Sequence, residues 1–237
     1  MYATATPTVE SKAGRKTMTG NASTAGARAD AHYLRVKQDL LDGRFGPGTV
    51  LLETTLGQSY GVSRTPMREA LARLAHDRLI ERTDRGYVVR ERSAEEIEAI
   101  YEARIPLEAA AAELAARRRS AIDVDRLAHL LAMRRDEKDT ARHPDWNSEF
   151  HVAMRDAARS AVITSSLGHL DDLLVDYRPD RAASATTNRG YLEHVEILEA
   201  IRRGDAAAAG ETMTSHLERM RDLRVAAHVR RTSARAH

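Results

Sequence analysis

Residues 61–74, GVSRTPMREALARL, constrain the fold more than any other stretch of this chain. Ser63 is a candidate N-cap, and Pro66 falls in the first turn of a helix, where its missing N–H costs little. The apolar residues behind this start recur at helical spacing and predict one buried face: Met67, Ala70, Leu71 and Leu74. The exposed start keeps three polar side chains: Arg64, Thr65 and Arg68. Such a helix is suited to contact an anionic partner.

The segments around this helix predict a winged helix-turn-helix. Three elements precede it: a helix from Ala31 to about Gly43, a turn over residues 44–51, and a short helix over residues 53–60. After it, two β-prone runs flank Asp84-Arg85-Gly86, a hairpin turn in which Gly86 can take a positive φ. Three helices and a hairpin is the order of a winged helix-turn-helix, with residues 63–77 as the recognition helix.

In such a fold the start of the recognition helix reaches base edges, and the hairpin tip reaches the minor groove or its phosphates. Arginine suits the acceptor pair of guanine, and its fork also clamps phosphate. We expect Arg64 and Arg68 to contact bases or adjacent phosphates and Thr65 to contact a phosphate. Arg85 and Gly86 are expected to form the DNA-contacting tip of the wing. The alternative is that these are ordinary exposed residues of a helix start and a turn.

Charge is divided unevenly along the 237 residues. Residues 1–92 hold 15 Lys+Arg and 10 Asp+Glu (15 − 10 = +5), and the rest holds 22 and 25 (22 − 25 = −3). A basic front half fits a nucleic-acid module. The chain has no cysteine, which excludes disulfides and thiolate metal sites. No apolar run approaches the roughly 18 residues of a membrane helix, so we expect a cytoplasmic protein with no membrane partner.

The chain beyond Ser93-Ala94-Glu95-Glu96, which is a capping box, is predicted to be all-helical. The helical segments are 97–118, 123–138, 146–160, 163–178, 190–204 and 206–229, with a loop over 178–190. The fold class is therefore mainly α. We expect three regions: a disordered tail (1–30) poor in large apolar groups, a winged helix-turn-helix (31–92) and an all-helical bundle (93–230).

Three histidines of the helical region are candidate metal ligands. His151 follows Asn147 by four residues, which puts both on one face of a helix. His194 and His216 lie on two further helices. Imidazoles gathered in a bundle beside an oxygen ligand suit a transition metal. Because the chain has 10 histidines, ordinary structural histidines are the alternative on spacing alone.

Several of these stretches resemble known families. YLRVKQDLLDGRFGPGTVL, GVSRTPMREALARL and RGYVV, within residues 33–89, resemble the winged-helix domain of GntR-family bacterial transcription regulators. One departure is Thr54, where some members carry an Arg, and this leaves the operator sequence open. EARIPLE at 102–108, EFH at 149–151, EHVEILEAIRRGD at 193–205 and MTSHL at 213–217 resemble the effector-binding FCD domain of the FadR subfamily.

The second resemblance implies a ligand set. In FCD domains an Asp and three His often hold a divalent metal, and a small carboxylate effector completes the coordination. The matching positions here are Asn147, His151, His194 and His216, with Zn as the expected metal and Ni, Co or Mn also suited. Asn147 is neutral where an acid is usual, so we expect weaker metal retention. Arg104 is expected to bind the effector carboxylate, with an i,i+4 pair to Glu108 as the alternative.

Together these features predict a homodimeric, ligand-responsive transcription regulator. We expect a repressor on a pseudo-palindromic operator that a small carboxylate releases, with residues 89–96 transmitting the signal. In the alternative, the divalent ion itself is the effector. An enzyme is disfavoured because the chain has no GxSxG, HExxH or paired-carboxylate signature. A constitutive architectural DNA-binding protein is disfavoured by the size of the C-terminal half.

Overall fold

The computed structural model describes residues 20–174 and 188–235. The winged-helix region consists of α1 (Gly20–Leu41), β1 (Val50–Leu51), α2 (Glu53–Tyr60), α3 (Arg64–His76), β2 (Ile80–Thr83) and β3 (Gly86–Val89). Helix α1 begins at Gly20 and not at Ala31, so the expected disordered tail was wrong for residues 20–30. The alanines of this stretch favour helix, which lets α1 extend backwards. Residues 1–19 of that tail lie outside the described residues.

The three strands form an antiparallel sheet in the order β1-β3-β2. The hairpin of β2 and β3 confirms the predicted wing, with Gly86 at φ +128°. Strand β1 was not predicted, because its residues lie in a stretch of turn signals and pair only with the distant β3. The pairing with β1 gives a second reason for glycine at position 86, because a Cβ there would lie 2.9 Å from the Leu51 carbonyl oxygen.

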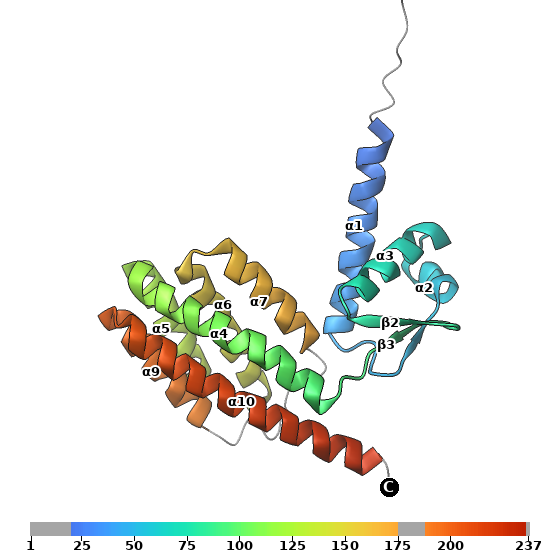
Figure 1. Ribbon diagram of the computed structural model, residues 1–237. Helices are drawn as coiled ribbons and strands as arrows, with labels where there is room; N and C mark the ends of the chain where they lie inside the picture. Colours follow the sequence, from blue (N-terminus) through green and yellow to red (C-terminus); the bar gives the residue numbers. More distant parts are fainter. Residues whose placement is uncertain (1–19, 175–187, 236–237) are drawn as a thin grey trace, which may run out of the picture.

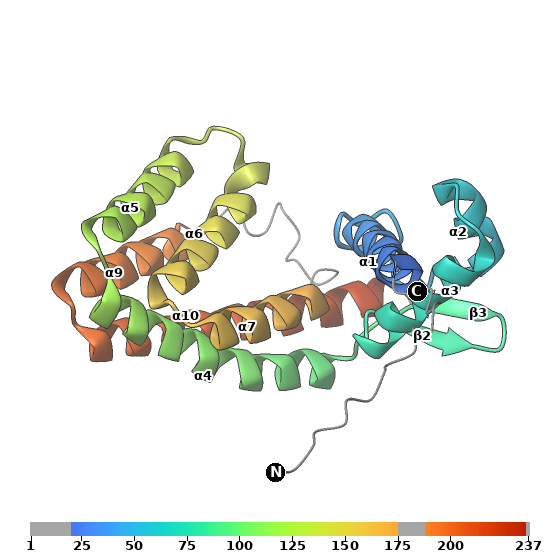
Figure 2. The same ribbon diagram turned by 90° about the horizontal axis from the view of Figure 1, so that it is seen from above.

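The remaining described helices form a bundle, which confirms the all-helical prediction. They are α4 (Ala94–Arg118), α5 (Ala121–Asp136), the short 3-10 helix η1 (Thr140–Arg142), α6 (His143–Ala158), α7 (Ala161–Leu173), α9 (Arg189–Arg203) and α10 (Ala206–Arg235). Helices α4 and α10 lie side by side, and the bundle lies to one side of the winged-helix region (Figures 1 and 2). Most of the predicted loop 178–190 lies outside the described residues.

Local sequence signals set the start and the course of α4. The Ser93 hydroxyl accepts a hydrogen bond from the Glu96 N–H (3.2 Å), and the Glu96 carboxylate accepts one from the Ser93 N–H (3.0 Å). This reciprocal pair is the predicted capping box. The helix continues through Pro106 without a break. No helix of the described residues is long and apolar enough to cross a membrane.

Candidate DNA-binding surface and candidate metal centre

Helix α3 separates an apolar face from a polar start. Its apolar face is fully buried: Met67, Ala70, Leu71 and Leu74. Ser63 occupies the N-cap position with extended backbone, as predicted, although its side chain makes no capping hydrogen bond. Arg64, Thr65 and Arg68 are exposed at this end of the helix. The buried face therefore anchors the helix while its start stays open to a partner.

The arginines expected to contact DNA have no acidic partner among the described residues. Arg85 is exposed at the hairpin turn, where its backbone N–H donates to the Thr83 hydroxyl (3.3 Å). Within the part of the chain that the structure describes, Arg64, Arg68 and Arg85 form no ion pair, whereas Arg73 of the same helix α3 pairs with Asp30. A guanidinium without a protein carboxylate is available to a phosphate or a base edge.

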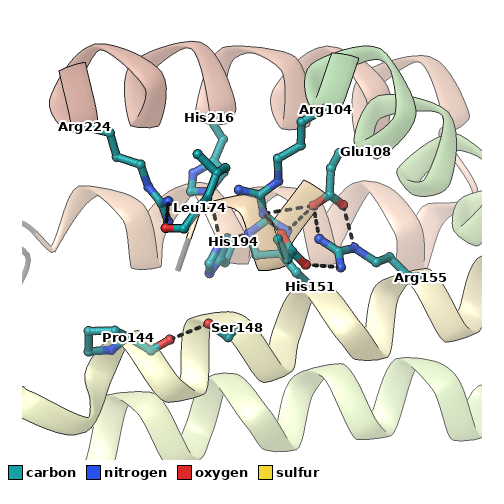
Figure 3. Close-up of polar contacts among 11 residues, drawn as sticks. Arg104, Glu108, Pro144, Ser148, His151, Arg155, Leu174, His194, His216 and Arg224 are labelled. Atoms are coloured by element: carbon teal, nitrogen blue, oxygen red, sulfur yellow. Dashed lines mark hydrogen bonds and ion pairs between the residues drawn. The ribbon is translucent and has the colours of Figure 1, made fainter. Parts of the chain in front are cut away.

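Three imidazoles from three helices converge in the bundle. His151 comes from α6, His194 from α9 and His216 from α10, and all three are buried. The His194 Nε2 lies 3.2 Å from the His151 Nε2 and 3.3 Å from the His216 Nε2 (Figure 3). Phe150 stacks on the His194 ring, with centroids 4.6 Å apart, and holds it in place.

This arrangement fits a transition metal. Nitrogens at about 2.0–2.1 Å from a tetrahedral ion lie about 3.3 Å from one another, which matches the measured separations. Burial, together with the neighbouring His216 and His151, holds the pKa of His194 well below its ordinary value. Burial likewise lowers the pKa of His216 to about 4. These two imidazoles are therefore neutral at neutral pH and keep lone pairs that a metal can take.

A carboxylate lies near the Nδ1 atom of two of the imidazoles. Glu193 lies 2.7 Å from the His216 Nδ1 and also pairs with Arg219. Burial raises the pKa of Glu193, but the hydrogen bonds from His216 and Arg219 outweigh it and lower the pKa to about 2. An ionised carboxylate on Nδ1 keeps the proton there and leaves Nε2 free as the ligand atom. Glu108 lies 3.5 Å from the His151 Nδ1, which is close in space, but that nitrogen has no hydrogen-bond partner among the described residues.

Asn147 lies one turn before His151 on α6, as its spacing predicts. Its Oδ1 is buried and has no hydrogen-bond partner. A buried acceptor without a donor is costly, and a bound cation would satisfy it. Of the four expected ligands, the structure brings one nitrogen from each of the three histidines within 4.8 Å of the others, and the role of Asn147 stays a prediction.

Arg104 lies in a buried cluster of charges next to His151 (Figure 3). Its guanidinium pairs with Glu108 (3.2 Å), and Arg155 donates to both Glu108 oxygens. Burial raises the pKa of Glu108, but the nearby His151, Arg155 and Arg104 outweigh it and hold the pKa well below its usual range. The predicted i,i+4 pair of Arg104 and Glu108 exists, but it is buried and not exposed.

Four charged residues of this site were not predicted from the sequence as part of it: Glu108, Arg155, Asp171 and Glu193. Arg155 follows His151 by four residues, which places both on one face of α6 and was a usable signal. Glu193 had no such signal, because neighbouring residues of a helix do not face each other and its partner, His216, is 23 residues away. No sequence pattern indicated Asp171. It lies on α7, whereas its partners Arg104 (3.1 Å) and Arg155 (2.5 Å) lie on α4 and α6, and spacing along one helix cannot show contacts between helices.

Comparisons with known proteins match both regions. Residues 29–89 match the family "Bacterial regulatory proteins, gntR family", and residues 98–219 match the FCD domain. The chain is 30% identical over 198 residues to the HTH-type transcriptional regulator YdhC of Bacillus subtilis strain 168, covering 78% of this chain and 85% of the relative. It is 29% identical over 198 residues to the HTH-type transcriptional repressor GlaR of Escherichia coli K12, covering 78% and 90%.

Solved structures share the fold. E. coli McbR/YncC superposes with a TM-score of 0.70 at 18% identity, covering 83% of this chain and 96% of that one. A transcriptional regulator GntR from Rhodococcus sp. RHA1 gives a TM-score of 0.68 at 23% identity, covering 84% and 98%. At these identities the likeness is evidence for the fold alone.

Proposed function

The chain belongs to the GntR family of bacterial transcription regulators and carries an FCD domain, and from this premise we propose that it is a repressor controlled by a small carboxylate bound in the bundle. That it is a DNA-binding transcription regulator, and not an enzyme, follows from the family. The observation that carries the finer proposal is the convergence of three buried imidazole Nε2 atoms beside a buried arginine cluster.

We assign the metal to His151, His194 and His216, with the Asn147 carbonyl as a further ligand. Its donor set of nitrogen and oxygen suits Zn, Ni, Co or Mn. A divalent ion held there offers coordination positions to an anionic effector. The Arg104 guanidinium supplies the fork that a carboxylate prefers. It is close to His151 in space, because both lie beside the Glu108 carboxylate, at 3.2 Å and 3.5 Å.

We propose that the DNA contacts lie at the start of α3 and at the wing. Arg64 and Arg68 would read bases or adjacent phosphates, Thr65 a phosphate, and Arg85 with Gly86 the adjacent groove. Their exposure and their lack of acidic partners among the described residues support this assignment. A two-fold homodimer would place two such surfaces on a pseudo-palindrome, in the cytoplasm where the DNA is. The regions proposed are residues 31–92 for DNA and 93–230 for effector and dimer contacts.

The first experiment is a metal analysis of the purified full chain. We expect about one transition-metal ion per chain. Alanine at His151, His194 or His216 should abolish it, while His169→Ala, at an exposed position of α7, should leave it unchanged. Metal that persists in all three variants would overturn the assignment.

The second experiment separates the two effector hypotheses. Operator fragments are selected from random DNA with the metal-loaded protein, and their release is then measured with carboxylates and with added metal salt. Release by a carboxylate at constant metal supports the proposal. Release or capture by the metal ion alone would favour a metal-responsive regulator.

A further inference from the structure

The last turn of α7 ties the bundle to the winged-helix region. The Asp172 carboxylate pairs with the Lys37 ammonium of α1 at 2.5 Å. The Leu173 carbonyl accepts a hydrogen bond from the Arg92 Nε at 2.7 Å. The same buried guanidinium donates to the Arg78 carbonyl, just beyond α3, at 2.8 Å. Any movement of this turn therefore changes contacts to both α1 and the end of the recognition helix.

The residue directly before these contacts faces the other way, into the charged cluster beside His151. Asp171 pairs with Arg104 at 3.1 Å and with Arg155 at 2.5 Å. These are the same two guanidinium groups that bind Glu108. Consecutive residues of α7 thus join the candidate effector site to the winged-helix region.

The two carboxylates of the cluster differ in how easily they can leave it. The Glu108 side chain is 0% exposed, and the Asp171 side chain is 37% exposed. Removing Glu108 would leave the buried Arg104 and Arg155 guanidinium groups without one of their carboxylates, whereas Asp171 already contacts water and can move into it. The cluster holds two cations and two anions. Exchanging Asp171 for another carboxylate keeps both guanidinium groups, Arg104 and Arg155, paired with two carboxylates.

We propose that Asp171 is an internal stand-in for the effector carboxylate. An incoming carboxylate takes its place on Arg104 and Arg155 and frees the last turn of α7. The ties from Asp172 to Lys37 and from Leu173 to Arg92 then loosen, and the winged-helix region changes its position on the bundle. This inference rests on the proposed function, because it takes a carboxylate as the effector. It adds the residue with which the effector competes and the route by which its binding reaches the DNA-binding region.

The test uses acetate as the carboxylate probe, titrated calorimetrically into the metal-loaded full chain, with chloride as the control anion. Asp171→Asn removes the internal competitor, so acetate should bind about tenfold more tightly. A merely structural Asp171 gives the opposite sign, because its loss would loosen the site and weaken binding. Asp136→Asn, at an exposed aspartate whose ion-pair partner in the described part of the chain is its neighbour Arg135, is the matched control and should change nothing.

Amide hydrogen exchange reports the loosening directly. In the wild type, acetate should speed exchange in peptides covering residues 168–174 and 88–93. Asp171→Asn should show the faster exchange without acetate. Lys37→Met breaks a tie without touching the cluster. Because coupling is reciprocal, it should raise acetate affinity by a smaller factor, about threefold.

The outcomes distinguish this inference from the proposed function. Acetate that binds the wild type, but binds Asp171→Asn equally or more weakly, refutes the stand-in and leaves the carboxylate effector in place. Acetate that binds none of the proteins refutes the carboxylate effector, and the stand-in with it. If Asp171→Asn fails to fold, Lys37→Met decides, since unchanged acetate affinity and unchanged exchange would refute the coupling.

Discussion

The winged-helix region and the bundle hold their functional side chains in opposite ways. At the start of α3, arginines project from an apolar core into solvent and have no acidic partner within the described residues. In the bundle, Arg104, Glu108 and Arg155 are buried, and the carboxylate pairs with both guanidinium groups. DNA is too large to enclose, so its contacts lie outside the core, whereas an ion or a small acid needs a desolvated site. Residues of the exposed site should contribute little to the free energy of unfolding, whereas residues of the buried site should contribute to it strongly.

The largest effect that this contrast predicts is the loss of a buried charge. Glu108→Gln leaves the guanidinium groups of Arg104 and Arg155 with Asp171 alone, and should lower the free energy of unfolding by about 3–5 kcal/mol. Urea denaturation of the metal-loaded chain measures it. Glu113→Gln, in an exposed pair with Arg117 of the same helix, should change it by less than about 0.5 kcal/mol. Equal losses at both positions would show that burial of the carboxylate is not the cause of the loss at Glu108.

The next effect concerns backbone packing in the winged-helix region. A Cβ on Gly57 of α2 would lie 2.9 Å from the Val62 carbonyl oxygen, so Gly57→Ala should destabilise the protein by about 1–3 kcal/mol. Gly168 of α7 has nothing within 4 Å of such a Cβ. Gly168→Ala should therefore stabilise the protein by about 0.5–1 kcal/mol. Thermal unfolding distinguishes the two signs, and a stable Gly57→Ala would contradict the close approach.

A DNA-contact arginine should affect binding without affecting stability. Arg64→Ala should weaken binding to a selected operator by about 1–3 kcal/mol, measured by fluorescence anisotropy at fixed salt. Its free energy of unfolding should stay within about 0.5 kcal/mol of the wild type, because Arg64 has no ion-pair partner in the described structure. Arg117→Ala, an exposed arginine of the bundle, is the control for net charge. A similar loss of affinity in both variants would point to general electrostatics and away from a contact at Arg64.

The smallest effect lies at the junction of the two regions. Ser93→Ala removes the hydroxyl of the capping box at the start of α4 and should cost about 1 kcal/mol of stability. Ser166→Ala, at an exposed position in the middle of α7, tests loss of a serine hydroxyl away from a cap and should be neutral or slightly stabilising. A cost at Ser166 as large as at Ser93 would show that the cap is not the cause.

The two regions also differ in how far their sites could be predicted. The recognition helix has its buried face and its exposed arginines within one short segment, so periodicity alone places them. The histidines of the bundle are 43 and 22 residues apart, and spacing could not bring them together. Their identification as a ligand set came from the resemblance of the surrounding motifs to a known domain. The carboxylates behind them, such as Glu193, needed the structure.

The sequence by itself determined the helices, the wing and the caps, because these depend on neighbours within a few residues. Ser93 with Glu96 and the apolar stripe of α3 are examples. Only the tertiary structure decided the pairing of β1 with β3 and the joining of Asp171 to Arg104 and Arg155. These contacts link positions far apart in the chain, and buried charges choose partners by position in space. Local pattern determines which elements form, and packing determines which side chains share a site.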